Sequence, residues 1–178
     1  KKQLSSFLKR HSINDNFTDC HEQFNPHAYD SLENVIGQHQ GFRIDLIKEN
    51  TLLRISSQKL LLTLNLRRGL TINSLALASH GMEPCIGTLP HGYFASIKHG
   101  VDYYSGGVVV ELPKERKKVT DLEKVVPYFL VNNDVIEVHV VIPSILGDIY
   151  KVIKVRPEKE KITLSYHFPK WDRPVGSI

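Results

Sequence analysis

The sequence has no long hydrophobic run and no segment that resembles a signal peptide. A membrane-spanning helix needs roughly 18 consecutive apolar residues. The most apolar stretch, Ser56–Leu66, is interrupted by Gln58, Lys59 and Thr63. The first ten residues include basic side chains, but no apolar region with a small-residue cleavage site follows them. We therefore expect no membrane-spanning segment and no membrane partner.

Cysteine is scarce, since Cys20 and Cys85 are the only two in 178 residues. A chain of this size with so few cysteines needs no disulfide framework, and we expect free thiols. Cys20 lies near His21, His27 and His39. Their spacings do not match the two close pairs that are typical of a zinc site, so we expect a histidine-rich surface leader and no bound metal.

The phosphate-binding loop, the dinucleotide fingerprint and the Gly-x-Ser-x-Gly elbow are all absent. Their absence argues against nucleotide cofactors and against an α/β-hydrolase nucleophile, and we expect no cofactor. The net charge is +4, with basic residues concentrated in Lys114–Lys118 and Lys151–Lys161. Both clusters are interleaved with glutamate and have no accompanying aromatic face, which favours solvated loops and strand faces over nucleic-acid binding.

Short apolar runs separated by turn residues begin at Gly41 and are typical of antiparallel β structure. The segment Lys59–Arg67 alternates, and Leu70–Leu77 resumes the alternation, so the two form a hairpin or one bent strand. In Val135–Ile142 every second residue, from Ile136 on, is apolar and is expected to face the core. Seven to ten strands with short turns predict a mainly β fold with a sandwich or barrel-like arrangement, of which we favour an antiparallel β-sandwich.

The first forty residues have a different pattern from the rest. Asp30–Ile36 has a capping residue followed by apolar spacing, which predicts a short helix ending at Gly37. We therefore divide the chain into a helical or irregular leader, residues 1–40, and a β-sandwich domain, residues 41–178. The chain starts without methionine and its last residues resemble an interrupted strand. We expect an upstream or downstream domain of a longer chain.

The segment His80–Gly107 is dense in glycine, proline, histidine and tyrosine, which predicts mostly loop. Aromatic rings stack on the apolar face of a sugar, and His, Asp, Glu or Arg side chains hydrogen-bond its hydroxyl groups. The candidate saccharide-binding residues are His91, Tyr93, His99, Asp102, Tyr104 and Glu111, with Arg67 as a group that can bind a carboxylate. A plainer interpretation is also open, in which the aromatic residues anchor the core and the glycines make turns.

Catalysis cannot be assigned to particular residues. Asp102 could pair with Glu111, or with Glu83, as the two carboxylates of glycoside hydrolysis, but their separation is not encoded in the sequence. His91 and His99 could act as general acids or bases, because histidine gains and loses a proton near neutral pH.

Three segments resemble a known family. The segment Asn65–Leu75, Asn-Leu-Arg-Arg-Gly-Leu-Thr-Ile-Asn-Ser-Leu, is similar to an early strand pair of the galactose-mutarotase-like β-supersandwich. His91–Phe94 is similar to part of the epimerase histidine motif, and Asp102–Glu111 resembles a sugar-facing loop and strand of related hydrolase domains. The resemblance implies an incomplete supersandwich of the kind found in aldose epimerases and in the β domains of glycoside hydrolases.

From these features we expect a carbohydrate-binding or carbohydrate-processing β domain with a saccharide ligand, associated with a glycoside hydrolase-like protein. Two alternatives stay open: a non-enzymatic structural or protein-interaction domain, and, with less support, an aldose epimerase. No catalytic role is transferred from the family, because the sequence has no counterpart of the epimerase's late glutamate base.

Overall fold

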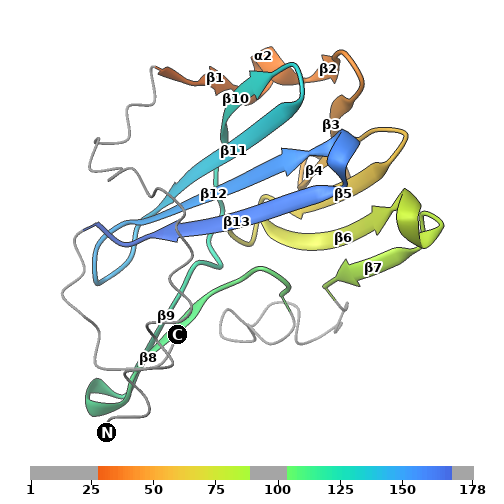
Figure 1. Cartoon of the computed structure of the whole chain (residues 1–178). Helices are drawn as coiled ribbons and strands as arrows, with labels where there is room; N and C mark the ends of the chain where they lie inside the picture. The colour runs from red at the N-terminus through yellow and green to blue at the C-terminus, as the bar shows by residue number, and fades with distance from the viewer. Residues whose placement is uncertain (1–27, 89–103, 170–178) are drawn as a thin grey trace, which may run out of the picture.

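The computed structural model describes residues 28–88 and 104–169 and shows two antiparallel sheets packed face to face (Figure 1). The predicted mainly β, antiparallel sandwich with a short helix near the N-terminus is therefore confirmed. His91, Tyr93, His99 and Asp102 lie outside the described residues.

One sheet has six strands in the order β2-β3-β4-β5-β6-β7, so neighbours in sequence are also neighbours in space. Its strands are β2 (Gly37–Gln38), β3 (Arg43–Ile47), β4 (Leu52–Ser56), β5 (Leu60–Asn65), β6 (Thr71–Leu77) and β7 (Pro84–Gly87). The predicted pair around Gly69 is a hairpin of β5 and β6, with a shift in register between Thr63 and Leu64. A short 3-10 helix, Ala78–His80, leads from β6 toward β7.

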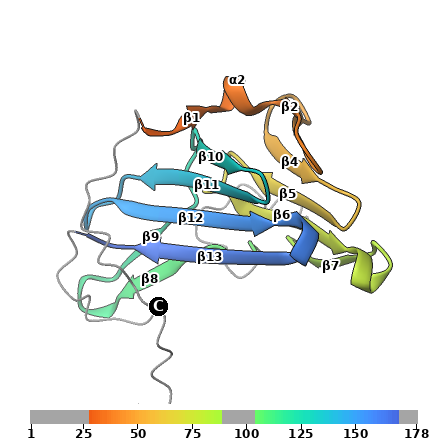
Figure 2. The same ribbon diagram turned by 45° about the horizontal axis from the view of Figure 1, so that its top comes forward.

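The other sheet has five strands in the order β1-β10-β11-β12-β13. Its strands are β1 (Asp30–Ser31), β10 (Tyr128–Asn132), β11 (Val135–Ile142), β12 (Ile149–Arg156) and β13 (Lys161–His167). β11, β12 and β13 run side by side across Figure 2. A separate ribbon pairs β8 (Val109–Leu112) with β9 (Lys117–Thr120), and 3-10 turns at Pro113–Glu115 and Pro157–Lys159 join neighbouring strands.

The core lies between the two sheets and contains apolar side chains from both. Because side chains alternate across a strand, every second residue of β11 points inward. Ile136, Val138, Val140 and Ile142 are all almost completely buried, as the sequence predicted. Their counterparts on the six-stranded sheet include Ile44, Leu53 and Leu62, each with no exposed surface. Closely packed aliphatic residues of this kind supply most of the driving force for folding.

The described part of the predicted leader joins both sheets. A short helix, α2 (Leu32–Val35), lies between β1, which pairs with β10, and β2, which pairs with β3. The helix is shorter than Asp30–Ile36, because Ser31 is already extended and Gly37 enters β2. Residues 28–40 therefore connect the edges of the two layers, and the domain boundary at residue 41 stays a prediction.

One strand of the fold was not predicted. Pro84–Gly87 lies within the segment predicted to be mostly loop, yet it pairs with β6 as the exposed edge strand β7. An edge strand tolerates proline and glycine because one side of it needs no ladder hydrogen bonds. Lys117 and Lys118, which belong to the basic cluster expected in solvated loops or strand faces, lie exposed at the start of β9.

Among the described residues, no helix has the length and hydrophobicity that crossing a bilayer requires.

Candidate functional site

Three of the sequence-predicted binding residues lie in the described part, on three different elements. Tyr104 is buried, with 7% of its surface exposed, just before the turn at Gly106. Glu111 is on β8, where its carboxylate lies 2.7 Å from the Lys118 ammonium directly opposite on β9. Arg67 is exposed in the β5–β6 turn. Neither of the two surface clefts described below is lined by any of these three side chains.

Thr88 and Ser105, which lie close to either side of residues 89–103 in the sequence, are neighbours on the six-stranded sheet. The Thr88 hydroxyl donates to the Ile72 carbonyl at 2.7 Å and accepts from the Ser105 N–H at 3.3 Å. The Ser105 hydroxyl in turn donates to the Gly87 carbonyl at 2.6 Å. Ile72 and Ser105 also form a β-bridge. These bonds hold Thr88 and Ser105 side by side against β6.

The side of the five-stranded sheet that faces away from the core, called here the outer face, carries several aromatic and polar groups. Ile149, Ile153 and Val155 of β12 point toward the core. Because side chains alternate along a strand, the residues next to these three along the strand point to the outer face. At one end are the ring-bearing residues Tyr128, His139, Tyr150 and His167. Toward the other end are the cationic residues Lys154, Arg156 and Lys161.

A hydrogen-bonded group lies near the centre of the outer face. Glu137 bonds Lys154 across the β11–β12 pair at 2.6 Å, and its second oxygen lies 3.2 Å from His139 Nε2. The Tyr29 ring packs on the His139 ring with centroids 4.5 Å apart. Burial lowers the pKa of His139, while Glu137 acts in the opposite direction. The arrangement is that of a neutral imidazole held in a fixed orientation on a sheet surface.

His139 gives a testable pH dependence. Its pKa is lower in the folded chain than the ordinary value of 6.5, so the unfolded chain binds the proton more readily. The stability that neutral His139 contributes is complete above pH 6.5 and is lost as the pH falls toward the folded-state pKa. We expect the H139Q variant to lose less unfolding free energy than the wild type when urea denaturation is compared at about pH 7.5 and 5.5. Equal acid-induced losses in both proteins would contradict this.

A second polar group is completely buried between the layers, and the sequence did not predict it. Lys151 and Asp121 have no exposed side-chain surface, and the Lys151 ammonium donates to Asp121 Oδ2 at 2.9 Å. It also donates to the carbonyls of Gly69 at 2.6 Å and Gly106 at 2.7 Å. An ammonium has three donors, so all three are satisfied. We call Gly69, Gly106, Asp121, Lys151 and Tyr166 the Lys151 cluster.

Three further interactions complete the Lys151 cluster. The Tyr166 hydroxyl also donates to the Gly106 carbonyl, and the Lys151 ammonium lies 5.2 Å from the centre of the Tyr166 ring. Asp121 Oδ1 accepts the Val108 N–H at 2.9 Å. Burial lowers the pKa of Lys151, opposed by the negative charge of Asp121, and burial raises the pKa of Tyr166 so that its phenol stays protonated. With every donor of Lys151 engaged and no exposed surface, the Lys151 cluster joins parts of the fold and is closed to a ligand.

The prediction that Lys151–Lys161 is a solvated cluster was therefore wrong for Lys151. Its place in the alternation of Ile149, Lys151, Ile153 and Val155 is the sequence signal that identifies it as inward-facing. No apolar residue could satisfy the two carbonyls and the carboxylate that converge on this point.

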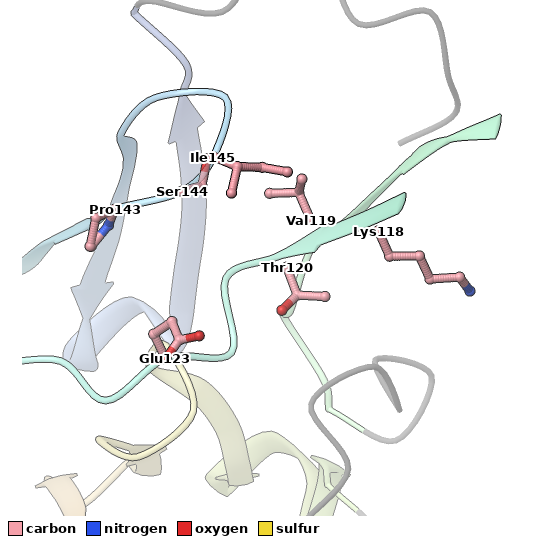
Figure 3. A pocket seen from close by; sticks show the side chains of 7 residues that line it. All are labelled: Lys118, Val119, Thr120, Glu123, Pro143, Ser144 and Ile145. Atoms are coloured by element: carbon pink, nitrogen blue, oxygen red, sulfur yellow. The ribbon is translucent and has the colours of Figure 1, made fainter. Parts of the chain in front are cut away.

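Two shallow clefts lie elsewhere on the surface. The first, of about 360 Å³, lies between β9 and the β11–β12 turn and is lined by Lys118, Val119, Thr120, Glu123, Pro143, Ser144 and Ile145. In Figure 3 the side chains of Ile145 and Val119 point toward each other, while that of Lys118 points away. The second, of about 490 Å³, has polar and apolar surface in about equal measure and lies near Gln38, Arg43, Ser57 and Glu158. Neither cleft brings together the groups of a recognisable catalytic site.

Metal ligands are not grouped in the described residues, where no three His, Cys, Asp or Glu side chains are placed to share an ion. His39, one of the histidines considered from the sequence, makes a 2.7 Å hydrogen bond with the Val35 carbonyl and stacks on Phe42. Cys85 is a free, exposed thiol, as expected.

Comparison of the chain with protein-family models, with curated proteins and with solved structures finds no match.

Proposed function

We propose that this chain is a carbohydrate-binding β-sandwich domain of a glycan-processing protein, and that the outer face contacts the saccharide. The observation that carries the proposal is the row of rings on that face. Tyr128 lies directly opposite His139, and Tyr150 lies directly opposite His167. Of the four, His139 is buried, with 8% of its surface exposed, and the other three residues are partly accessible.

Rings on a sheet surface suit a sugar for a physical reason. The C–H groups of a pyranose form an apolar patch that packs on an aromatic ring, while its hydroxyl groups need hydrogen-bond partners. Ser165 on β13 offers a hydroxyl group two residues from His167, and Thr163 offers another opposite Lys154. Glu137 and His139 offer fixed polar atoms. An open face of this kind fits a chain of sugars lying along the strands better than a single enclosed sugar.

Residues 89–103 belong to the same proposal on sequence grounds. His91, Tyr93, His99 and Asp102 have the chemistry of a saccharide site. H91A and D102N, assayed together with the outer-face variants below, test whether that segment contributes to the same ligand. The aldose epimerase alternative is tested by the rate of α/β anomer interconversion.

Truncating Tyr150 tests the proposal directly. We expect Y150A to bind oligosaccharides about five- to tenfold more weakly than the wild type, because the ring would lose its stacking contact with the sugar. Affinity electrophoresis in gels containing soluble polysaccharides identifies the ligand, and calorimetry with its oligosaccharides gives the dissociation constant. L61A is the matched control, since Leu61 points outward from the six-stranded sheet and is similarly half-buried.

Two results would contradict the proposal. One is a wild-type protein that binds none of the neutral or acidic polysaccharides in the panel. The other is an equal affinity of Y150A and the wild type for a saccharide that does bind, which would place the site away from the outer face.

A protein-interaction domain is the second candidate, favoured by one observation. Ile145 is 69% exposed at the rim of the first cleft, opposite the partly apolar wall formed by Val119 (Figure 3). Protein contact sites combine exposed apolar groups with a polar rim. Capture of a defined partner by the wild type but not by I145D, with saccharide binding absent from both, would favour this candidate.

A further inference from the structure

The cationic end of the outer face suggests which class of saccharide binds there. Arg156, the last residue of β12, lies directly opposite Lys161, the first residue of β13. Both belong to the outer face, because Val155 and Ile162, their neighbours along the strands, face the core. Two like charges directly opposite each other in an antiparallel pair destabilise the sheet unless an opposite charge lies between them.

Neither of these two cations is in an ion pair with any residue that the structure describes. Several other cations on the strands do have an ion-pair partner. Lys154 pairs with Glu137 at 2.6 Å, and Lys118 pairs with Glu111 at 2.7 Å. On the six-stranded sheet Arg43 and Arg54 share Asp45, and the hydrogen bond from Arg43 keeps the pKa of Asp45 below its ordinary value.

The acidic residues closest in sequence are engaged elsewhere. Glu158 and Glu160 lie in the turn that joins Arg156 to Lys161. Glu158 pairs with the Lys59 ammonium at 3.2 Å, and Glu160 accepts the Ser79 N–H at 3.1 Å. Lys59 and Ser79 both belong to the other layer, so these carboxylates bond across the sandwich edge. The positive charge of Arg156 and Lys161 is left directed at solvent.

We infer that the saccharide bound by the outer face is acidic, with the carboxylate of a uronic acid held between Arg156 and Lys161. This inference rests on the proposed carbohydrate-binding function and specifies its ligand. A guanidinium binds a carboxylate through two parallel hydrogen bonds, and the opposing ammonium adds a third contact.

The same strand supplies both halves of the site. Tyr150 and Arg156 are six residues apart on β12, which corresponds to about 20 Å at the rise of an extended strand. Val152 and Lys154 lie between them on the same face. A ligand that contacts the ring and the cations together is therefore an oligosaccharide of several units, aligned with β12 and β13.

The test compares one acidic and one neutral ligand of equal length. Calorimetry is done with oligogalacturonate and with the matching neutral oligogalactose, using the wild type and the R156Q/K161Q double variant. We expect the wild type to prefer the acidic ligand, and the double variant to bind it about fivefold more weakly, from two partly exposed ion pairs. Binding of the neutral ligand should not change.

The matched control is K114Q/K117Q, which removes the same charge from exposed positions before and within β9. It should bind oligogalacturonate as the wild type does, and raising the salt concentration should weaken the wild type more than R156Q/K161Q.

The possible results separate the two proposals. Binding of the neutral ligand with no effect of R156Q/K161Q on either ligand overturns the acidic-saccharide inference and leaves the carbohydrate proposal intact. Absence of binding to both ligands, and to the wider polysaccharide panel, overturns both proposals. Equal binding of an oligothymidylate of the same charge, weakened by the same variant, would overturn the inference in favour of unspecific anion binding.

Discussion

Replacing Lys151 with methionine is expected to lower the free energy of unfolding by about 3–5 kcal/mol, since the change leaves a buried carboxylate without its counter-charge. The Lys151 ammonium has no exposed surface and donates to Asp121 and to two carbonyls. Methionine fills similar space but satisfies none of these acceptors. Urea denaturation followed by circular dichroism measures the change.

Two variants make this result interpretable. K154M removes a lysine of the same strand that pairs with Glu137 and whose side chain is 40% exposed. This substitution should lower the free energy of unfolding by less than about 1 kcal/mol. The double variant K151M/D121N removes both charges, and it should recover part of the stability lost in K151M. A loss in K151M no greater than that in K154M would show that the buried pair contributes little to the fold.

Replacing Gly69 with alanine is expected to destabilise the protein by about 3 kcal/mol or more, because two effects add. The φ angle of Gly69 is +58°, in the left-handed region that side chains other than glycine's rarely adopt. A Cβ atom at this position would also lie 2.9 Å from the Asp121 carbonyl carbon, and still closer to its oxygen. The backbone at Asp121 cannot move aside without disturbing Lys151.

Gly81 provides the matched control for this substitution. Its φ angle is +69°, but a Cβ atom there would meet nothing within 4 Å. G81A should therefore show the conformational cost alone, about 1–2 kcal/mol. The difference between the two variants in thermal or urea unfolding measures the steric term. Equal losses in G69A and G81A would mean that the Asp121 backbone moves aside easily.

The apolar alternation was sufficient to predict most of the fold. Val135–Ile142 forms one strand and Lys59–Leu77 forms a hairpin of two, as expected. When apolar residues alternate with polar ones and one face of the sheet is buried, only one orientation of the strand puts the apolar side chains in the core. The edge strand β7 was not predicted, since Pro84 and Gly87 disfavour strands and none of its residues is buried. Its pairing with β6 comes from the tertiary structure, which overrides local propensity.

The candidate site was less predictable, because it depends on register. Arg156 and Lys161 are separated by a turn in the sequence, and nothing in their spacing shows that they lie directly opposite each other. The same is true of Tyr128 and His139, which meet only when the β10–β11 pairing is known. The sequence-based prediction relied on glycine-rich and histidine-rich segments instead, because the composition of a loop can be read without knowing which strands pair.

Lys151 also selects among alternative strand pairings. A slip of β12 by one residue would turn Lys154 and Arg156 into the core, so hydrophobicity alone excludes it. A slip by two residues keeps every apolar side chain inside, and hydrophobicity alone cannot reject it. That slip would carry the buried ammonium about 7 Å away from the carbonyls of Gly69 and Gly106, which lie on fixed turns. The cost of an unsatisfied buried charge makes the native pairing the only one of the three that is stable.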